Sequence, residues 1–252
     1  MTNLLRKYFL RCLLAIGLIA AAPTLIAMTV QPVVLDLTTA GRGMSQVITV
    51  ENTFATPLPI EMRIQELAFG ESGVEGTGND PGDLLVFPMQ ALIQPGQTQS
   101  FRVQYVGDPE LPSSKHYYVT AAQLPVELPE GQSAIQILYN FQILVSVSPA
   151  GVEPGVSVVS AEIGRNAEGQ PVPVVVLNNS STAHGYLSQG RLRIIQRDAS
   201  GDAIFRRTLP GPEIQQTVGF GLVGAGQTRR LTIPIVLPTD GGTIEAQFTP
   251  DD

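Results

Sequence analysis

The fold of this chain is decided by the stretch Ala134-Ile135-Gln136-Ile137-Leu138-Tyr139-Asn140-Phe141-Gln142-Ile143-Leu144-Val145-Ser146-Val147-Ser148. Every odd-numbered position from Ile135 to Val147 is apolar, and the positions between them are mostly polar. Alternation with a period of two is typical of a β-strand with one apolar face. At about 3.3 Å per residue the strand would be roughly 50 Å long, more than the core of one small sandwich needs. We therefore expect its surplus apolar surface to meet a partner.

The first 27 residues are typical of a secretory signal peptide. Three basic residues precede an apolar run over 13–22, and the segment ends in Leu25-Ile26-Ala27, which predicts cleavage after Ala27. An uncleaved membrane anchor is the alternative, but Pro23 interrupts the run, which is shorter than the ~20 residues that a membrane span needs. We expect an exported, periplasmic protein with no stable membrane insertion after cleavage.

The composition of the remaining chain limits its partners. The single cysteine, Cys12, lies in the signal segment, so the mature chain has no disulfide and depends on packing alone. Cleavage removes three basic residues and no acidic one, which changes the formal net charge from −7 to −10. Such an acidic chain is not expected to bind nucleic acid.

The rest of the chain predicts an all-β protein. Short runs rich in Val, Ile, Thr and Tyr are separated by Gly, Pro, Asn and Asp, at spacings typical of immunoglobulin-like sandwiches. In the first half, the predicted strands besides the opening stretch are 29–37, 44–51, 58–69, 84–87, 97–106 and 115–124. In the second half they are 156–163, 171–178, 189–196, 203–209, 215–219, 227–237 and 243–248. Two tandem sandwiches are the expected architecture.

Two segments of loop composition divide the series. Residues 149–155 are rich in Pro and Gly, and we expect them to form an elbow between an N-terminal domain over 28–148 and a C-terminal domain over 156–252. Residues 70–83 are rich in Gly, but they contain no Lys and no helix can follow Asp80-Pro81. We therefore expect a solvated hairpin loop there and no phosphate site.

No motif of the sequence indicates catalysis. The two histidines, His116 and His184, are more than sixty residues apart, lie in different predicted domains and have no cysteine to activate. No His or Asp cluster has the spacing of metal ligands, and we expect neither a metal nor another cofactor. We interpret His116, beside Tyr117 and Tyr118, as a partly buried strand residue. Binding is therefore favoured over catalysis, and the opening stretch offers both backbone and apolar side chains for β-strand addition.

Several motifs occur in the order found in one protein family. The segment from Ile93-Gln94-Pro95-Gly96 to Phe101-Arg102-Val103 resembles its Leu-x-Pro-Gly loop followed by an apolar-Arg strand. The segment 117–125 resembles its Phe-Tyr-x-Asn-x-x-x-Ile-Pro strand, and Asn52 and Asn178-Asn179 resemble asparagines that end strands in its two domains. On these residues the chain resembles the periplasmic chaperones of the chaperone-usher pathway, which fold and cap the subunits of fimbriae.

The resemblance implies two immunoglobulin-like domains in an L shape, with the subunit held in the cleft. In that family, alternate apolar residues on the last strand of the first domain complete the subunit's unfinished sandwich, and the complex passes to an outer-membrane usher. The matching positions here are Ile135, Ile137, Tyr139 and Phe141, with Ile143 as an extension. Each side chain, if fully buried, would contribute roughly 1.5–3 kcal/mol before ordering costs.

The chain departs from the family at the residues that hold the subunit's terminal carboxylate. Typical members carry an Arg and a Lys there, and the matching positions are Thr39 and Leu144. A divergent subgroup with another anchor, a chaperone that depends on the strand alone and a relative with another client all remain open. If another anchor exists, Arg102 and Arg63 are the candidates on predicted strands of the first domain. A secreted structural or adhesive protein, with the long strand wholly intramolecular, is the alternative function.

Overall fold

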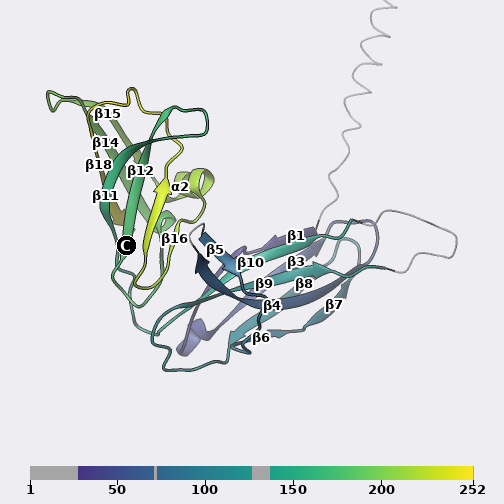
Figure 1. Cartoon of the computed structure of the whole chain (residues 1–252). Coiled ribbons are helices and arrows are strands. Elements are labelled where there is room, and N and C mark those ends of the chain that lie inside the picture. The colour runs from purple at the N-terminus through teal and green to yellow at the C-terminus, as the bar shows by residue number, and fades with distance from the viewer. Residues whose placement is uncertain (1–27, 71–72, 127–136, 252) are drawn as a thin grey trace, which may run out of the picture.

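The computed structural model describes residues 28–70, 73–126 and 137–251. They form two β-sandwiches that make the two arms of an L (Figure 1). The last strand of the first arm ends at Ser148, the first strand of the second begins at Val156, and residues 149–155 connect them. The prediction of an all-β chain with two tandem sandwiches in an L shape is confirmed. Within the described ranges, no helix is long and apolar enough to span a bilayer.

Two sheets pack face to face in the first domain. One sheet has the order β1-β3-β8-β6, with bounds Met28–Gln31, Ser45–Asn52, Thr98–Tyr105 and Leu84–Phe87. The other has the order β2-β10-β9-β4-β5, with bounds Val34–Thr38, Asn140–Ser148, Lys115–Gln123, Leu58–Gly70 and Gly73–Gly76. A further strand, β7 (Gln90–Ile93), pairs with β4. The opening stretch therefore provides an inner strand of the second sheet.

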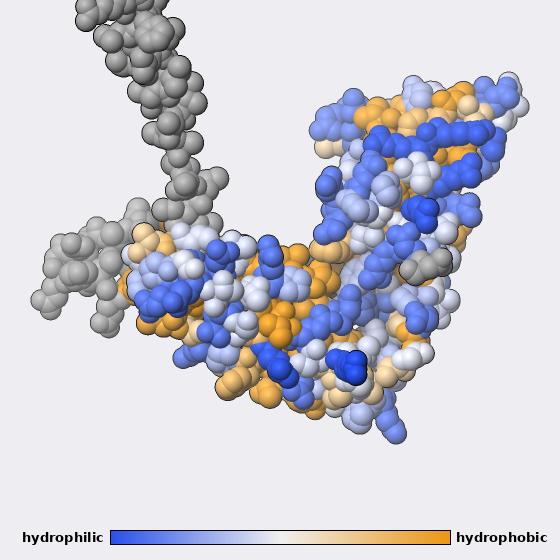
Figure 2. Space-filling model, turned by 180° about the vertical axis from the view of Figure 1, so that it is seen from behind, coloured by the Kyte–Doolittle hydropathy of each residue, from blue (hydrophilic) through white to orange (hydrophobic). Residues whose placement is uncertain are grey.

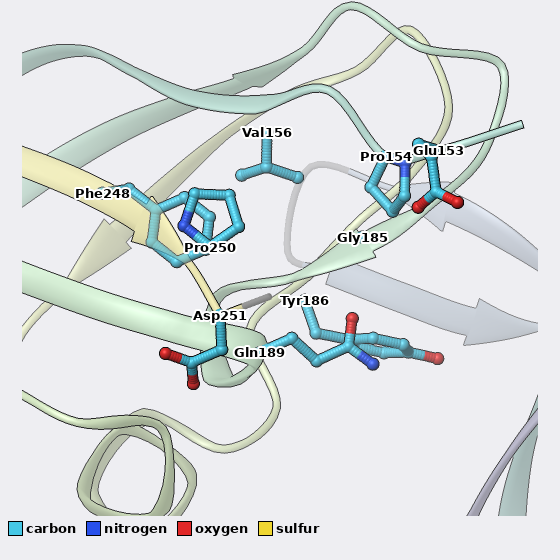
Figure 3. Close-up of a pocket in the computed structure, with 9 residues that line it drawn as sticks. All are labelled: Glu153, Pro154, Val156, Gly185, Tyr186, Gln189, Phe248, Pro250 and Asp251. Atoms are coloured by element: carbon cyan, nitrogen blue, oxygen red, sulfur yellow. The ribbon is translucent and has the colours of Figure 1, made fainter.

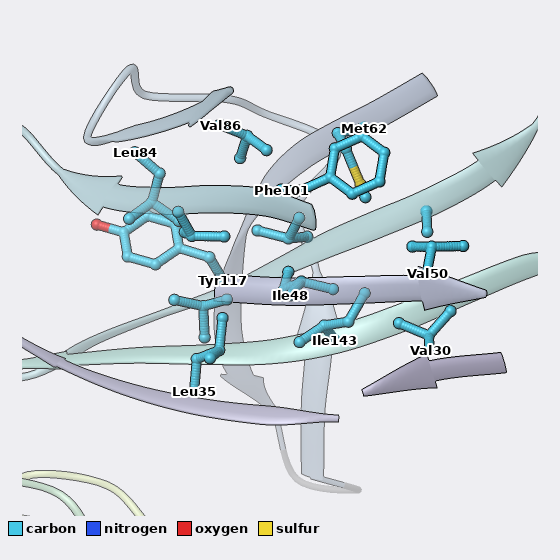
Figure 4. Packing of buried hydrophobic residues seen from close by; sticks show 14 of the residues in the cluster. Val30, Leu35, Ile48, Val50, Met62, Leu84, Val86, Phe101, Tyr117 and Ile143 are labelled. Carbon is cyan, nitrogen blue, oxygen red and sulfur yellow. The ribbon is translucent and has the colours of Figure 1, made fainter. Parts of the chain in front are cut away.

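The core of the first domain lies between these sheets. Side chains from both sheets point toward one another (Figure 4), and each of the following is exposed by 1% or less: Leu35, Ile48, Phe101, Tyr117 and Ile143. Alternation along each strand sends every second residue into this layer. Full burial of such a side chain contributes about 1.5–3 kcal/mol.

The second domain is built from shorter strands. One three-stranded sheet has the order β11-β12-β17, with bounds Val156–Arg165, Pro171–Asn179 and Thr228–Thr232. The other has the order β15-β14-β18, with bounds Ala203–Leu209, Gly190–Arg197 and Thr243–Pro250. A two-stranded pair, β13 (Gly185–Tyr186) with β16 (Leu222–Val223), lies among the loops. The short helical turns η1 and η2 span Gly41–Met44 and Leu187–Gln189.

An asparagine at the end of one strand in each domain organises the loop that follows. The Asn52 side-chain amide donates to the carbonyls of Thr56 and Ile93 at 2.9 and 2.8 Å, and Asn52 is fully buried. The Asn179 amide likewise donates to the carbonyls of Ala183 and Val223. Buried amides that satisfy loop backbone groups are costly to replace, because the loop carbonyls would lose their donors.

Four predicted strands differ from the structure. The opening stretch, predicted as one long strand over 134–148, forms a strand only as β10 (Asn140–Ser148), and residues 137–139 are not in a strand. The predicted strand 227–237 ends early, since β17 stops at Thr232. The predicted strand 29–37 is divided into β1 and β2, which belong to different sheets, because Pro32 lacks an N–H and breaks the ladder. The predicted strand 215–219 is wrong, since helix α2 spans Gly211–Val218. Ile214 and Val218, four residues apart, lie on one face of that helix, and Gly219 ends it with φ 81°.

The glycine-rich loop 70–83 is more ordered than predicted. β5 lies within it and pairs with the end of β4, from Leu67 to Gly70, so a hairpin forms as expected but contains an additional strand. Residues 71–72, between the paired strands, lie outside the described residues.

Candidate functional site

The candidate site is the segment from Ile137 through β10, and its apolar face changes character along its length. Ile143, Val145 and Val147 are fully buried in the core of the first domain. Phe141 and Tyr139 are partly buried and pack against that core, and the Tyr139 ring lies 5.7 Å from the Phe54 ring. Ile137 is 70% exposed. Exposure of this face therefore grows toward the beginning of the segment.

These placements refine the predicted donor face. Ile143 belongs to the chain's own core, because its side chain is fully buried between the two sheets of the first domain. Ile137 presents an apolar side chain to solvent, and Tyr139 and Phe141 are half-covered. Ile135 lies outside the described residues.

One edge of β10 is open along its first half. On one side, β9 pairs with β10 from Asn140 to Val147. On the other side, β2 pairs in parallel only with Leu144 to Ser148, and the Leu144 N–H donates to the Val33 carbonyl at 3.0 Å. Among the described residues, no strand pairs with this edge from Asn140 to Ile143. Unpaired backbone groups on a sheet edge are a template for another strand.

This edge of β10 is open because the chain enters the sheet of β10 only after Pro32. β1 pairs with β3 in the opposite sheet, so it does not continue the lane that β2 occupies beside β10. The open edge thus follows from the sheet switch between β1 and β2.

The polar face of β10 is buried at its other end, against the second domain. Ser146 is fully buried and Ser148 is 9% exposed. The Ser146 hydroxyl lies 3.0 Å from the Tyr186 hydroxyl, and Ser148 Oγ lies 2.9 Å from His184 Nδ1. These two serines therefore belong to a polar network that joins the two domains.

Asp36 on β2 is the carboxylate of this network. Its Oδ1 accepts a hydrogen bond from the Tyr186 hydroxyl at 2.8 Å and lies 2.9 Å from His184 Nε2. A ring that donates from Nε2 leaves Nδ1 as the acceptor for a serine hydroxyl, which fits the contacts of His184 with Ser148 and Ser114. The side chains of His184 and Tyr186 in the second domain are thus held by Asp36 and by serines of the first domain.

His116 occupies the innermost position. Its Nδ1 lies 2.8 Å from Ser146 Oγ, and its Nε2 has no hydrogen-bonding partner among the described residues. Its ring packs edge-on against Phe69 and His184, with centroids 5.1 and 5.2 Å apart. Burial, with a smaller contribution from His184, lowers the pKa of His116 to about 3. Burial, and then Asp36, raise the pKa of the Tyr186 phenol.

The Ser148–His184–Asp36 contacts have the connectivity of a hydrolase triad but the wrong exposure. A triad presents its serine to the substrate and buries its aspartate. Here Ser148 is buried, whereas the Asp36 side chain is 43% exposed. The arrangement fits a brace between the domains better than a catalytic centre.

Sequence reasoning placed the two histidines apart and missed the brace. The two domains bring the rings together, and His116 is buried at 3% exposure, deeper than the partial burial predicted. A signal was present in the polar series of the strand, which changes from Asn140 and Gln142 to Ser146 and Ser148. Small hydroxyl residues fit against a second domain, where long amides would not.

The two positions predicted to match the family clamp, Thr39 and Leu144, do not pair with each other, and both serve the fold of this chain. Thr39 is 4% exposed, and its hydroxyl accepts a hydrogen bond from the Ala150 N–H at 3.2 Å. Leu144 is partly buried and pairs with Val34. Neither position offers a cation, and the charged group in the brace is the acidic Asp36.

The two predicted anchors lie on different sheets. Arg102 pairs with Phe87 and is exposed on the sheet that does not contain β10, so its placement argues against contact with a partner on the β10 edge. Arg63 aligns with Thr120 and, through it, with Gln142 on the outer face of the β10 sheet. It forms an ion pair with Glu61 at 2.7 Å and keeps 62% of its side chain exposed.

Three further surfaces are hollow or apolar. A cavity of about 840 Å³ between the domains is lined by Val30, Gln31, Pro32, Val33, Val34, Val47, Thr49, Gln215 and Phe220. A cavity of about 460 Å³ in the second domain (Figure 3) is lined by Glu153, Pro154, Val156, Gly185, Tyr186, Gln189, Phe248, Pro250 and Asp251. On the first domain, the apolar side chains of Leu85, Phe87, Met89 and Leu92, on β6, β7 and the turn between them, are 47–73% exposed.

Comparison with solved structures places this geometry among known folds. A chain of a chaperone–tip adhesin complex of CFA/I fimbriae is 14% identical, with 89% of this chain and 100% of that chain covered and a TM-score of 0.51. The YadV chaperone is 12% identical, with 88% and 91% covered and a TM-score of 0.51. This chain has the fold of the fimbrial chaperones. A chain from the complex of a Salmonella enterica SafA pilin with the SafB chaperone is 13% identical, with 91% and 98% covered and a TM-score of 0.51.

Among the comparisons with known proteins, only the comparison of structures finds the fimbrial-chaperone fold that the motifs predicted. No family model and no curated protein sequence matches this chain. At 12–14% identity the likeness establishes the fold and does not by itself establish the function.

Proposed function

We propose that this protein is a periplasmic chaperone that captures pilus subunits by strand addition and delivers them to an outer-membrane usher. The observation that carries the proposal is the open edge of β10 from Asn140 to Ile143, beside the exposed side chain of Ile137. A subunit strand added there would bond to the free backbone groups, and its core would cover Ile137 and the half-covered Tyr139 and Phe141.

The brace supports the same role. Strand addition in a cleft requires that the second domain keep its orientation, because a captured subunit touches both arms. Asp36 lies on β2, on the same side of β10 as the open edge but farther along the strand, and its contacts with His184 and Tyr186 join the arms. No catalytic step or cofactor is part of this proposal.

Delivery requires a second surface that remains accessible when the β10 edge is occupied. The apolar patch of Leu85, Phe87, Met89 and Leu92 lies on β6, β7 and the turn between them, and neither strand pairs with β10. Phe87 is 73% exposed. An exposed apolar patch of this kind is typical of a protein-docking surface, and we assign it to the usher.

The test is capture of exported subunits. The protein is co-expressed with the exported subunits encoded beside its own gene and purified from the periplasm. Ile137→Asp is expected to abolish co-purification and to leave the free protein folded, because its side chain is exposed. Capture at the wild-type level would contradict the proposal. Tyr139→Asp is a weaker test, because Tyr139 also packs against Phe54 in the chain's own structure.

The same material tests delivery. The captured wild-type complex and a Phe87→Ser complex are offered to the purified usher. The Phe87→Ser complex is expected to keep its subunit and to lose usher binding, whereas equal usher binding by both complexes would remove the patch from this role.

The alternative, a secreted structural or adhesive protein, predicts a long strand that is wholly covered by its own domain. The exposure of Ile137 and the open edge favour the chaperone. Under the alternative, Ile137→Asp would leave all partner binding unchanged.

A further inference from the structure

The cavity between the two domains lies where the open lane beside β10 ends. The lane is the strand position next to β10 on the side of β2. Among the described residues it is unoccupied beside Asn140 to Ile143, and this chain occupies it from Val33 onward, where the Val33 carbonyl accepts a hydrogen bond from Leu144 N–H. Pro32, Val33 and Val34 also line the inter-domain cavity of about 840 Å³. A strand added in this lane therefore ends at the mouth of that cavity.

The added strand is taken to run in the direction of β2, which occupies the same side of β10 farther along. Because β2 runs parallel to β10, a strand that continues the same hydrogen-bonding pattern in the same lane runs parallel as well. Its carboxyl-terminal end then points at Val33. The residue that meets the cavity is the last one of the added strand.

The chemistry of the cavity is apolar. Val33 and Val47 from the first domain are 48% and 44% exposed, and the partly buried Phe220 faces them from the second domain. The polar lining residues are the neutral Gln31, Thr49 and Gln215, and no charged residue of the described chain lines the cavity, although Arg102 pairs with the lining residue Val47. Figure 2 shows hydrophobic surface gathered on the first domain near the angle of the L.

We propose that this cavity binds an apolar side chain at the carboxyl-terminal end of the captured subunit strand, in place of a salt bridge to the terminal carboxylate. This inference rests on the proposed function. It explains how Leu144 and Thr39 can stand at the clamp positions, since a terminal residue held by an apolar contact requires no cation. The acidic Asp36 nearby would repel a carboxylate.

The first test changes the cavity without changing its shape. Val33→Thr and Val47→Thr replace a methyl group by a hydroxyl on exposed side chains, and both residues suit a β-strand. Together they are expected to lower the amount of captured subunit about tenfold, since an unmatched hydroxyl in an apolar contact opposes burial. Val236→Thr, at 50% exposure in the second domain, is the matched control and should have no effect.

Phe220→Ala is the stronger variant. It removes the aromatic wall contributed by the second domain, but its ring also lies 6.2 Å from that of Tyr186. Loss of capture by Phe220→Ala supports the inference only if the Val33→Thr and Val47→Thr variants also lose capture, because those two substitutions preserve the backbone and the side-chain volume.

The second test changes the bound end. Three peptides of the last ten residues of the captured subunit are compared. The first ends in a free carboxylate, the second ends in an amide, and in the third the last apolar residue is replaced by Ser. The amide is expected to bind as well as the acid, and the Ser peptide about tenfold more weakly. Binding that depends on the carboxylate and not on the side chain would overturn the inference.

The outcomes separate this inference from the proposed function. If Ile137→Asp abolishes capture and the paired valine variants do not lower it, the chaperone role stands and the cavity assignment is wrong. If Ile137→Asp has no effect, the proposed function itself fails. If the valine variants break a dimer of the free protein and leave capture unchanged, a second copy of the chain occupies the cavity and the inference is overturned.

Discussion

The two halves of the segment from Ile137 to Ser148 share one alternating pattern but have different neighbours. In the second half, the core covers the apolar face, the second domain covers the polar face, and β2 and β9 pair with the two edges. In the first half, Ile137 is exposed, and β9 pairs with β10 on one side only. Alternation reports which side chains share a face, and it does not report what covers that face.

The largest expected difference between the halves is in folding. Val145→Asp places a carboxylate in a fully buried position and is expected to destabilise the first domain by several kcal/mol, enough to prevent recovery of folded protein. Ile137→Asp is expected to change the free energy of unfolding by no more than about 0.5 kcal/mol. Urea unfolding of both variants checks the contrast, and equal losses of stability would show that the halves are equally buried.

Only the second half of the segment, through His116 beside Ser146, is expected to make the stability of the protein depend on pH. The His116 ring faces His184, Ser146 and Phe69, with Asp36 next along the network. Because its pKa falls from 6.5 to about 3 on folding, the unfolded state binds the proton first. Stability is therefore complete above about pH 6.5 and is lost as the pH falls toward 3, by up to about 1.4 kcal/mol per pH unit.

The pH effect is measured by urea unfolding between pH 7 and pH 4. His116→Gln keeps a donor for Ser146 but does not titrate, so its stability should vary less with pH than that of the wild type. A variant profile parallel to the wild-type profile would assign the dependence to other groups.

The smallest effects are expected from the two arginines. Arg102→Ala should alter subunit capture less than twofold, because Arg102 is exposed and does not line the cavity, although it pairs with the cavity residue Val47. Arg63→Ala removes an exposed ion pair that solvent screens, and it should alter capture less than twofold. Pull-down of subunits by each variant measures this directly. A large loss with Arg63→Ala would indicate a cationic anchor near Gln142 and would argue against the apolar cavity.

The predictability of the site differed from residue to residue. The exposed Ile137 follows from the excess length of the apolar pattern, whereas the match of Thr39 and Leu144 to the family's clamp positions stays a prediction. The contact between the rings of His116 and His184 could not be predicted from the sequence, because the two residues are 68 positions apart and lie in different domains. Helix α2 was missed because eight residues with two apolar positions fit a strand or a helix equally well.

The sequence by itself determined the all-β character, the two domains and the strand that organises the first of them. Alternation, prolines and glycines act over a few residues, so they can be read locally. Only the tertiary structure decided which half of that strand is covered, where its edge is open and that a polar brace joins the domains. Edges and interfaces depend on pairing between segments far apart in the chain. Here the residues before Pro32 pair in the opposite sheet, so the strand position beside Asn140–Ile143 is unoccupied in the described part of the chain.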